Sequence, residues 1–385
     1  MKNPDDSLDR FSAISRVASG LISARLFTRH PLVLLHAVTE ACNARCPYCV
    51  FRHGKQCSDE LSMEEISVLY LEARMLGVQY VHLWGGEPLV HPRIADIARE
   101  AKKNRLMVGL VTNGALLERK CEEVLPWVDR VYVSLDHPTP KHDEMRATPG
   151  LFEAALRGIR KVRALRPRQI IVVSFTLYRE NADAVEDMVK LCREMDLRVY
   201  VNPMRAAANS AGDAPAAHNE RVFEVDNADL LIPWEEQREV WNRLIELKRD
   251  RYPIQNTIPY MRKIARTGKK PSYRCHWPKI AVSVDANGDV VDCQRWDQPI
   301  ANLRTTSLAE ALCLPRSREL CGEVGESCNA CVSPARVEPS GIWGLKPNMI
   351  AHSFQTLALR RPGRPKRKGG RKRKAKREAR QRKAS

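Results

Sequence analysis

The sequence has no apolar run that approaches the ~20 residues needed to cross a bilayer, which excludes an integral membrane protein. It also lacks a secretory signal, because the N-terminus reads MKNPDDSLDR and contains no apolar h-region. Twelve cysteines without a signal peptide indicate a reducing compartment, where clustered cysteines bind metal or do redox chemistry more often than they form disulfides. We therefore expect a cytoplasmic protein and exclude a secreted disulfide scaffold.

Acidic residues are scarce in one part of the chain, its C-terminus. The 385 residues carry a formal net charge of +18, which suggests a nucleic-acid binder. Residues 360–385 hold 15 Lys and Arg and one acid, Glu378, so this tail alone has a net charge of +14. The other 359 residues hold 49 basic and 45 acidic groups. Such a tail cannot fold alone, so we expect a nearly neutral globular body followed by a disordered basic tail.

Strand and helix patterns alternate between residues 32 and 201. Short β-branched or apolar runs predict strands at Leu32–Thr39, Gln79–Leu83, Leu106–Val111, Arg130–Leu135, Gln169–Leu177 and Arg198–Val201. Apolar spacing near 3.6 predicts helices at Ser62–Leu76, Ile94–Lys103, Ala115–Val124, Leu151–Leu165 and Asp183–Met195. This alternation predicts an α/β fold of parallel βαβ units, as an open sheet or a partial barrel.

The pattern changes after Val201. A helix is expected at Trp234–Arg249, and Asn287-Gly288 between two apolar runs predicts a hairpin with a type I′ turn. We divide the chain into an N-terminal helical extension (1–30), the barrel (31–205), a loop and helical linker (206–272), a small Cys-rich hairpin and helix region (273–345) and a C-terminal segment ending in the tail (346–385).

Three cysteines follow the first predicted strand. Cys42, Cys46 and Cys49 have the spacing Cys-x3-Cys-x2-Cys. One interpretation is a zinc site completed by His53 or Cys57, because structural zinc takes four N or S ligands. The other is an iron–sulfur cluster with three protein ligands, which leaves one iron open to a small molecule. The spacing alone does not separate these two interpretations.

Glycine and polar residues follow the next three strands. The second strand ends in Gly85-Gly86-Glu87-Pro88, where the glycines would let backbone approach a ligand and Glu87 would accept from an ammonium group. The third ends in Thr112-Asn113-Gly114 and the fourth in Ser134-Leu135-Asp136. Because the carboxyl ends of parallel strands meet at one edge, we expect these segments to lie near the cysteine loop.

In this order, the segments resemble those of radical S-adenosylmethionine (SAM) enzymes. The cysteine loop, with Tyr48 before its last cysteine, resembles the cluster loop of that family, and Gly85-Gly86-Glu87-Pro88 resembles its methionine-amino-binding motif. The segments at 112–114 and 134–136 resemble those of the molybdenum-cofactor-cyclase-like branch. The resemblance covers about residues 32–201 and implies a partial (β/α)6 TIM barrel.

The resemblance also implies cofactors and roles. Cys42, Cys46 and Cys49 would hold a 4Fe–4S cluster whose open iron binds SAM. Reduction by an electron donor such as a flavodoxin or ferredoxin would then cleave SAM to methionine and a 5′-deoxyadenosyl radical. Glu87 would accept from the SAM ammonium, and Tyr48 would lie against the adenine or simply pack. The remaining contacts, to ribose or carboxylate, would come from Asn113, Ser134 and Asp136.

A second group of cysteines surrounds the predicted hairpin. Cys275 and Cys293 flank Gly288 with the spacing Cys-x12-Gly-x4-Cys, and Cys328 and Cys331 follow. The pattern is similar to the auxiliary-cluster extensions of radical SAM enzymes called SPASM and twitch. Since no cysteine follows Cys331, the shorter twitch form is the better match. It implies a second iron–sulfur cluster on these four cysteines, and a zinc ribbon on the same thiolates is the alternative.

The substrate is left open. SPASM-type enzymes often modify ribosomal peptides, but those commonly carry a peptide-binding domain before the barrel, and only ~30 residues precede the first strand here. The segment with His142-Asp143 and Gly150-x-Phe152 is loosely similar to hopanoid adenosyltransferases, so a lipid or isoprenoid is another candidate. The basic tail would bind nucleic acid or an anionic membrane. A zinc-containing nucleic-acid-binding protein is the non-enzyme alternative, and it leaves the motif at 85–88 without a role.

Overall fold

The computed structural model describes residues 31–49, 51, 59–204, 228–267, 273–291, 299–319 and 333–344. The predicted N-terminal extension and basic tail lie outside these residues, as do Cys293, Cys328 and Cys331. The predicted boundary after residue 205 lies outside them too, so the division into domains stays a prediction. No helix in the described ranges is long and apolar enough to cross a membrane.

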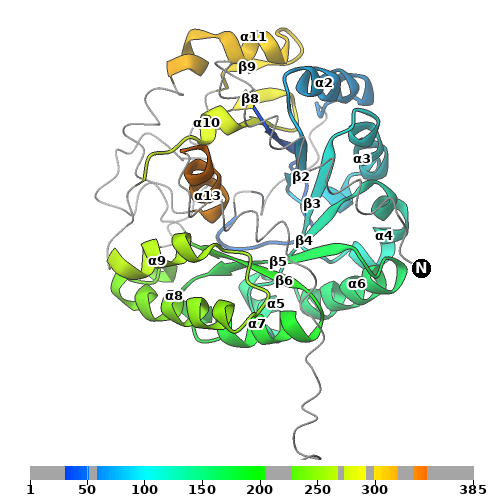
Figure 1. Cartoon of the computed structure of the whole chain (residues 1–385). Coiled ribbons are helices and arrows are strands. Elements are labelled where there is room, and N and C mark those ends of the chain that lie inside the picture. Colours follow the sequence, from blue (N-terminus) through cyan, green and yellow to red (C-terminus); the bar gives the residue numbers. More distant parts are fainter. Residues whose placement is uncertain are drawn as a thin grey trace, which may run out of the picture.

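The described residues form a sheet of nine strands in the order β6-β5-β4-β3-β2-β1-β7-β8-β9. The strands are β1 (Val33–Thr39), β2 (Tyr80–Gly85), β3 (Met107–Thr112), β4 (Arg130–Ser134), β5 (Ile170–Leu177), β6 (Arg198–Pro203), β7 (Ala281–Val284), β8 (Asp289–Val291) and β9 (Ala301–Asn302). Strands β1 to β6 are parallel and each lies beside its sequence neighbour, as the alternation predicts. The sheet curves without closing, so the fold is a partial barrel (Figure 1).

Helices cover the outer face of the six parallel strands (Figure 1). They are α2 (Met63–Met75), α3 (Ile94–Lys103), α4 (Leu117–Val124), α6 (Leu151–Leu165) and α7 (Val185–Glu194), with the short α5 (Lys141–Met145) after β4. The first of these helices begins where the sequence pattern predicts it. The Ser62 hydroxyl accepts from the backbone N–H of Glu65, and the Glu65 carboxylate accepts from the backbone N–H of Ser62.

Side chains alternate between the two faces of each strand. Val81 and Leu83 of β2 and Val131 of β4 are fully buried beneath the helices. Their neighbours Tyr80, His82 and Tyr132 therefore point into the barrel. The ring centroid of His82 lies 4.7 Å from that of Tyr80 and 5.1 Å from that of Tyr132. The barrel interior below the strand ends thus holds aromatic rings in edge-on and tilted contact.

The hairpin β7–β8 is present, but its turn differs from the predicted type I′. Such a turn needs positive φ at both central residues, and here Gly288 alone takes it, at 89°. Gly288 N–H donates to Asp285 O, and Asp285 N–H donates to Asp289 O, so the loop has three residues. The third residue of such a loop takes the left-handed conformation, which explains why glycine occupies this position.

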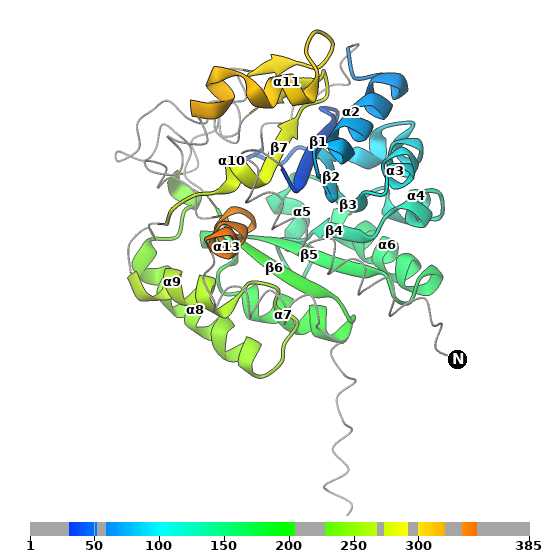
Figure 2. The same cartoon turned by 45° about the horizontal axis from the view of Figure 1, so that its top comes forward.

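The Cys-rich region joins the barrel sheet directly, which the sequence did not indicate. Strand β7 pairs in parallel with β1 on the side opposite β2. The remaining helices are α8 (Trp234–Arg249), α9 (Ile258–Thr267), α10 (Trp277–Ile280), α11 (Leu308–Cys313) and α13 (Pro334–Trp343). Helix α13 lies between α9 and α10, on the side where the barrel is open (Figures 1 and 2).

Candidate active site

The loop after β1 brings the three predicted cysteines together. Cys46 is buried, Cys42 and Cys49 are partly buried, and none of the three is in a disulfide. The backbone N–H of Cys49 donates to Cys46 O at 3.1 Å, and that of Ala44 donates to Cys42 Sγ at 3.4 Å. The pKa of the Cys42 thiol is raised to about 11, chiefly by burial and also by the neighbouring Glu87, Cys46 and Cys49, while the hydrogen bond from Ala44 N–H lowers it.

The three thiols are a donor set that suits iron. In the described part of the chain, no three His, Cys, Asp or Glu side chains are arranged to hold a single metal ion. A 4Fe–4S cubane does not need its three cysteines to point at one metal position, because each cysteine sulfur binds a different iron. Iron would have to displace the thiol protons, as metal binding to cysteine generally does. His53 and Cys57, which the zinc alternative needs, lie outside the described residues.

The two glycines at the end of β2 lie directly against the cysteine loop. A Cβ atom on Gly85 would overlap Thr39 O, and one on Gly86 would overlap the carbonyls of Glu40 and Ala41. Gly86 N–H donates to Thr39 O at 2.9 Å, and Glu87 N–H donates to Ala41 O at 2.8 Å. The backbone of residues 39–41, which leads into the cysteine loop, therefore lies close against both glycines. A close approach of a ligand to this turn stays a prediction.

Glu87 is buried and its carboxylate is already hydrogen-bonded within the chain. One oxygen accepts from Thr112 Oγ1 at 2.7 Å and from Leu89 N–H at 3.0 Å, and the other accepts from Asn113 N–H at 2.6 Å. Burial nevertheless raises its pKa to about 7. The carboxylate fixes the ends of β2 and β3 and starts the turn at Pro88. Its contact with an ammonium group stays a prediction.

Asn113 reaches the cysteine loop from β3. Its Nδ2 donates to Asn43 Oδ1 at 2.8 Å, between Cys42 and Ala44, and its own Oδ1 accepts from Ala115 N–H at 2.9 Å. Ser134 ends β4 on the face that points into the barrel, since Val133 beside it lies in the core under the helices. The structure thus places Asn113 against the loop and Ser134 at the same end of the sheet.

Asp136 is fully buried and pairs with Arg146, a residue that the sequence analysis did not select. Arg146 Nε and Nη2 lie 2.8 and 2.7 Å from Asp136 Oδ2, which also accepts from Tyr48 Oη at 2.8 Å. Arg146 Nη1 lies 3.9 Å from Cys46 Sγ. Asp136 therefore forms an internal ion pair beside the cysteine loop, and Tyr48 is tied to that pair. The contact of Asp136 with SAM stays a prediction.

The segment that suggested a lipid-modifying enzyme has structural contacts. His142 Nδ1 accepts from Asp136 N–H at 3.0 Å. The Asp143 carboxylate accepts from Gly150 N–H and Phe152 N–H, both at 2.7 Å, and so holds the start of α6. Arg146 lies one helical turn after His142, and no local signal in the sequence connects it with Cys46, which is 100 positions earlier. These contacts explain the pattern without a lipid.

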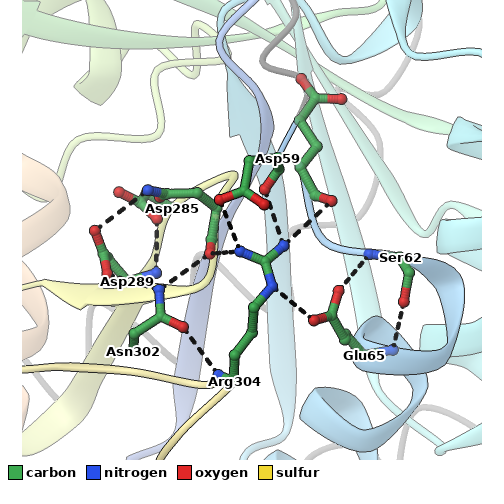
Figure 3. Close-up of polar contacts among 9 residues, drawn as sticks. Asp59, Ser62, Glu65, Asp285, Asp289, Asn302 and Arg304 are labelled. Carbon is green, nitrogen blue, oxygen red and sulfur yellow. Dashed lines mark hydrogen bonds and ion pairs between the residues drawn. The ribbon is translucent and has the colours of Figure 1, made fainter.

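Arg304 connects the hairpin region to the far end of the cysteine loop (Figure 3). Its guanidinium donates to Asp59 Oδ2 at 3.1 Å, Asp59 O at 2.9 Å, Glu65 Oε1 at 2.8 Å and Asn287 O at 3.0 Å. Leu61 N–H also donates to Ala286 O at 2.8 Å. The loop is therefore held at its entry by β2 and at its exit by the hairpin region.

Of the predicted second cysteine group, the structure describes Cys275 alone. Cys275 is buried and packs with Trp277 and Ile280 at the start of β7. Cys293, Cys328 and Cys331 lie outside the described residues, so their joint site stays a prediction.

Comparison with known proteins agrees with the geometry. Residues 37–192 match the Radical SAM superfamily profile. The chain is 24% identical to the PqqA peptide cyclase of Gluconobacter oxydans over 287 residues, which are 73% of this chain and 76% of that protein. It is 31% identical to the GTP 3′,8-cyclase of Peptoclostridium acidaminophilum over 181 residues, 45% of this chain, and spans 56% of that protein's length.

A solved structure shows the same fold. SuiB of Streptococcus suis bound to the precursor peptide SuiA superposes with a TM-score of 0.60 at 15% sequence identity. The match covers 85% of this chain and 73% of SuiB. Because 85% of the chain exceeds the span of the barrel, the likeness of fold extends beyond residues 37–192.

Proposed function

The chain belongs to the radical SAM superfamily, and from this premise we propose that it is a radical SAM enzyme whose substrate is a peptide. The observation that carries the substrate class is the match to the PqqA peptide cyclase, which extends over 287 residues and so beyond the 37–192 domain. The lipid alternative rested on the segment around His142, whose contacts are internal.

The family's cofactors are a 4Fe–4S cluster and SAM, and the cysteine loop offers a place for the first. When bound and reduced, the cluster supplies the electron that cleaves SAM to methionine and a 5′-deoxyadenosyl radical. We assign Cys42, Cys46 and Cys49 as its ligands. Glu87 and Asn113 hold this loop against the ends of β2 and β3 through the contacts to Thr112 and Asn43.

We assign contacts with SAM to groups near the loop whose hydrogen-bonding capacity is not taken up by the contacts described above. Ser134 and the backbone at Gly85 and Gly86 lie at the strand ends beside the loop, and Tyr48 presents its ring from within it. Glu87 and Asp136 act as positioning residues, because their carboxylates accept from the chain's own donors. The proposed auxiliary cluster uses Cys275, Cys293, Cys328 and Cys331.

We also propose a location and an electron donor for the enzyme. Clusters held by cysteine need a reducing compartment, which supports the cytoplasm as the location and a flavodoxin or ferredoxin as the donor.

The composition of the tail bears on its partner. The tail at 360–385 has fifteen Lys and Arg but no aromatic, Leu, Ile or Val residue. Without apolar anchors a membrane would be held by charge alone, so nucleic acid is the favoured partner.

The test begins with anaerobic purification and reconstitution with iron and sulfide. The protein should show a 4Fe–4S spectrum and release 5′-deoxyadenosine from SAM with a reductant, and Cys46→Ala should abolish that release. Zinc in a colourless protein that releases none would favour the non-enzyme alternative. Cys313→Ala is the matched control, because Cys313 is exposed on α11.

The substrate class is tested with synthetic peptides copied from short reading frames next to the coding sequence. A peptide substrate should raise the release of 5′-deoxyadenosine, and its mass should change. The amount of modified peptide should match the amount of 5′-deoxyadenosine released. If none of the peptides changes mass while an isoprenoid lipid does, the peptide assignment is wrong.

A further inference from the structure

A buried ion pair between Asp136 and Arg146 stands beside the cysteine loop, and the assignments above give Arg146 no role. Asp136 has no exposed surface and Arg146 is 9% exposed. Two guanidinium nitrogens, Nε and Nη2, contact one carboxylate oxygen at 2.8 and 2.7 Å. The third, Nη1, lies 3.9 Å from Cys46 Sγ. The positive end of the pair therefore faces a proposed cluster ligand, and the negative end faces away from it.

Several elements fix the orientation of this pair. Asp136 follows β4, and its second carboxylate oxygen accepts from Thr176 N–H of β5 at 2.8 Å. The backbone carbonyl of Asp136 accepts from Asn181 Nδ2 at 2.8 Å, and its backbone N–H donates to His142. Arg146 directly follows α5. The carboxylate is thus held from β5 and by Tyr48, and the guanidinium bound to it places Nη1 toward Cys46.

The electrostatic consequence has a definite sign. Reduction adds one negative charge to a cluster, so a fixed cation and an N–H donor at a ligand sulfur favour the reduced form. An unpaired guanidinium could not be buried there, because removing a charge from water costs several kcal/mol unless a partner is present. Asp136 supplies that partner on the side away from the sulfur.

We propose that Arg146 raises the reduction potential of the cluster held by Cys42, Cys46 and Cys49, and that Asp136 is the positioning residue that keeps the guanidinium at Cys46. This inference rests on the proposed function, since it needs the cluster to be present. It concerns how readily the first electron enters the site. Glu87 and Asp136 are acids that interact with both Arg146 and the loop cysteines, and their charges oppose the effect of Arg146.

The experiment is a redox titration of the reconstituted full chain without SAM, followed by electron paramagnetic resonance. The signal of this cluster is the part that disappears in the Cys42→Ala, Cys46→Ala, Cys49→Ala triple variant. Arg146→Gln should lower the ratio of reduced to oxidised cluster at a fixed poise about tenfold, which is about 59 mV for a one-electron couple. Arg146→Lys, which keeps the charge, should lie between Arg146→Gln and the parent.

Asp136→Asn removes the partner that holds the guanidinium beside Cys46, so it should lower the potential as Arg146→Gln does, by a smaller amount. The Arg146→Gln, Asp136→Asn double variant should lie no lower than Arg146→Gln alone, whereas independent damage by the two substitutions would add. Arg157→Gln, which breaks the exposed pair with Glu118 on α4, should leave the potential at the parental value.

An unchanged potential in Arg146→Gln overturns the inference, and so does a double variant whose potential falls clearly below that of Arg146→Gln alone. Weaker SAM binding at an unchanged potential also overturns it, because Arg146 would then be a SAM contact. If the parent itself shows no cluster signal that depends on the three cysteines, the proposed function fails, and this result is distinct from a failure of the inference.

Discussion

Glu87 illustrates how a buried acid can serve the site without touching a ligand. Its carboxylate receives three hydrogen bonds from the chain, yet burial outweighs them and raises its pKa to about 7. Near neutral pH the residue can therefore be either charged or neutral while it connects β2 to β3.

The raised pKa predicts a pH dependence of stability. Between about 4.5 and 7 the folded apo-protein holds a proton at Glu87 that the unfolded chain has lost, so this residue makes the free energy of unfolding fall as pH rises. Glu87→Gln removes that dependence. Relative to the parent, we expect the variant to gain up to about 3 kcal/mol between pH 5 and pH 8, measured by urea unfolding.

Glu118→Gln is the control for this measurement, since Glu118 is an exposed partner of Arg157. Its difference from the parent should stay flat over the same pH range. A flat difference for Glu87→Gln as well would mean that the carboxylate is charged throughout.

Residue types and spacing were enough to predict that the three loop cysteines, the glycine pair and Glu87 lie close together at the strand ends. Arg146 was missed because its contact with Cys46 joins positions 100 residues apart. Only the register of the strands brings α5 beside the first loop. The internal partners of Glu87 and Asp136 were missed for a related reason, because a sequence shows an acid but not the donors around it.

At the scale of elements, periodicity predicted all six parallel strands and the five longer helices between them, and it missed the short α5. Helix α13 was missed because it contains Pro339 and Gly341, which disfavour helix. Its burial between α9 and α10 compensates. Glu338 on this helix accepts from Thr257 N–H at 2.6 Å and from Tyr200 Oη at 3.2 Å. These tertiary contacts are not visible in local sequence.

The contacts of Arg304 lead to a prediction about how firmly the cysteine loop holds iron. Arg304→Gln loses the contacts to Asp59 and Glu65 and frees the exit of the loop from the hairpin region. We expect reconstituted protein to release iron to a chelator several-fold faster than the parent. Arg304→Lys should recover only part of the difference, because one ammonium cannot replace a planar fork of donors.

The matched control is Arg243→Gln, which breaks ion pairs with Glu186 and Glu246 on α7 and α8, at the other end of the molecule (Figure 1). It should release iron at the parental rate. Equal rates for Arg304→Gln and Arg243→Gln would show that the exit of the loop needs no support from the hairpin region.

At the scale of the whole molecule, charge is divided between two parts. Deletion of residues 360–385 removes a net charge of +14 and leaves the barrel and its cysteines intact. We expect release of 5′-deoxyadenosine to persist, and binding to RNA, measured by fluorescence anisotropy, to be lost. In the full chain that binding should weaken steeply between 50 and 200 mM salt, because it releases counterions.

Vesicles of anionic lipid are the comparison in the same assay. Tail-dependent binding to vesicles without binding to RNA would contradict the choice of nucleic acid. Loss of SAM cleavage on deletion would show that the tail is needed by the catalytic body.

The pairing of β1 with β7 also constrains the order in which the chain can fold during synthesis. Residue 33 pairs with residue 281, about 250 positions later, while its other neighbour, β2, emerges much sooner. At ~5–20 residues per second the ribosome takes roughly 12–50 s to supply β7. Throughout that time β1 is an open sheet edge, which is prone to pair with other chains. The nascent enzyme is therefore most exposed to aggregation, and most in need of chaperones, before its last third is made.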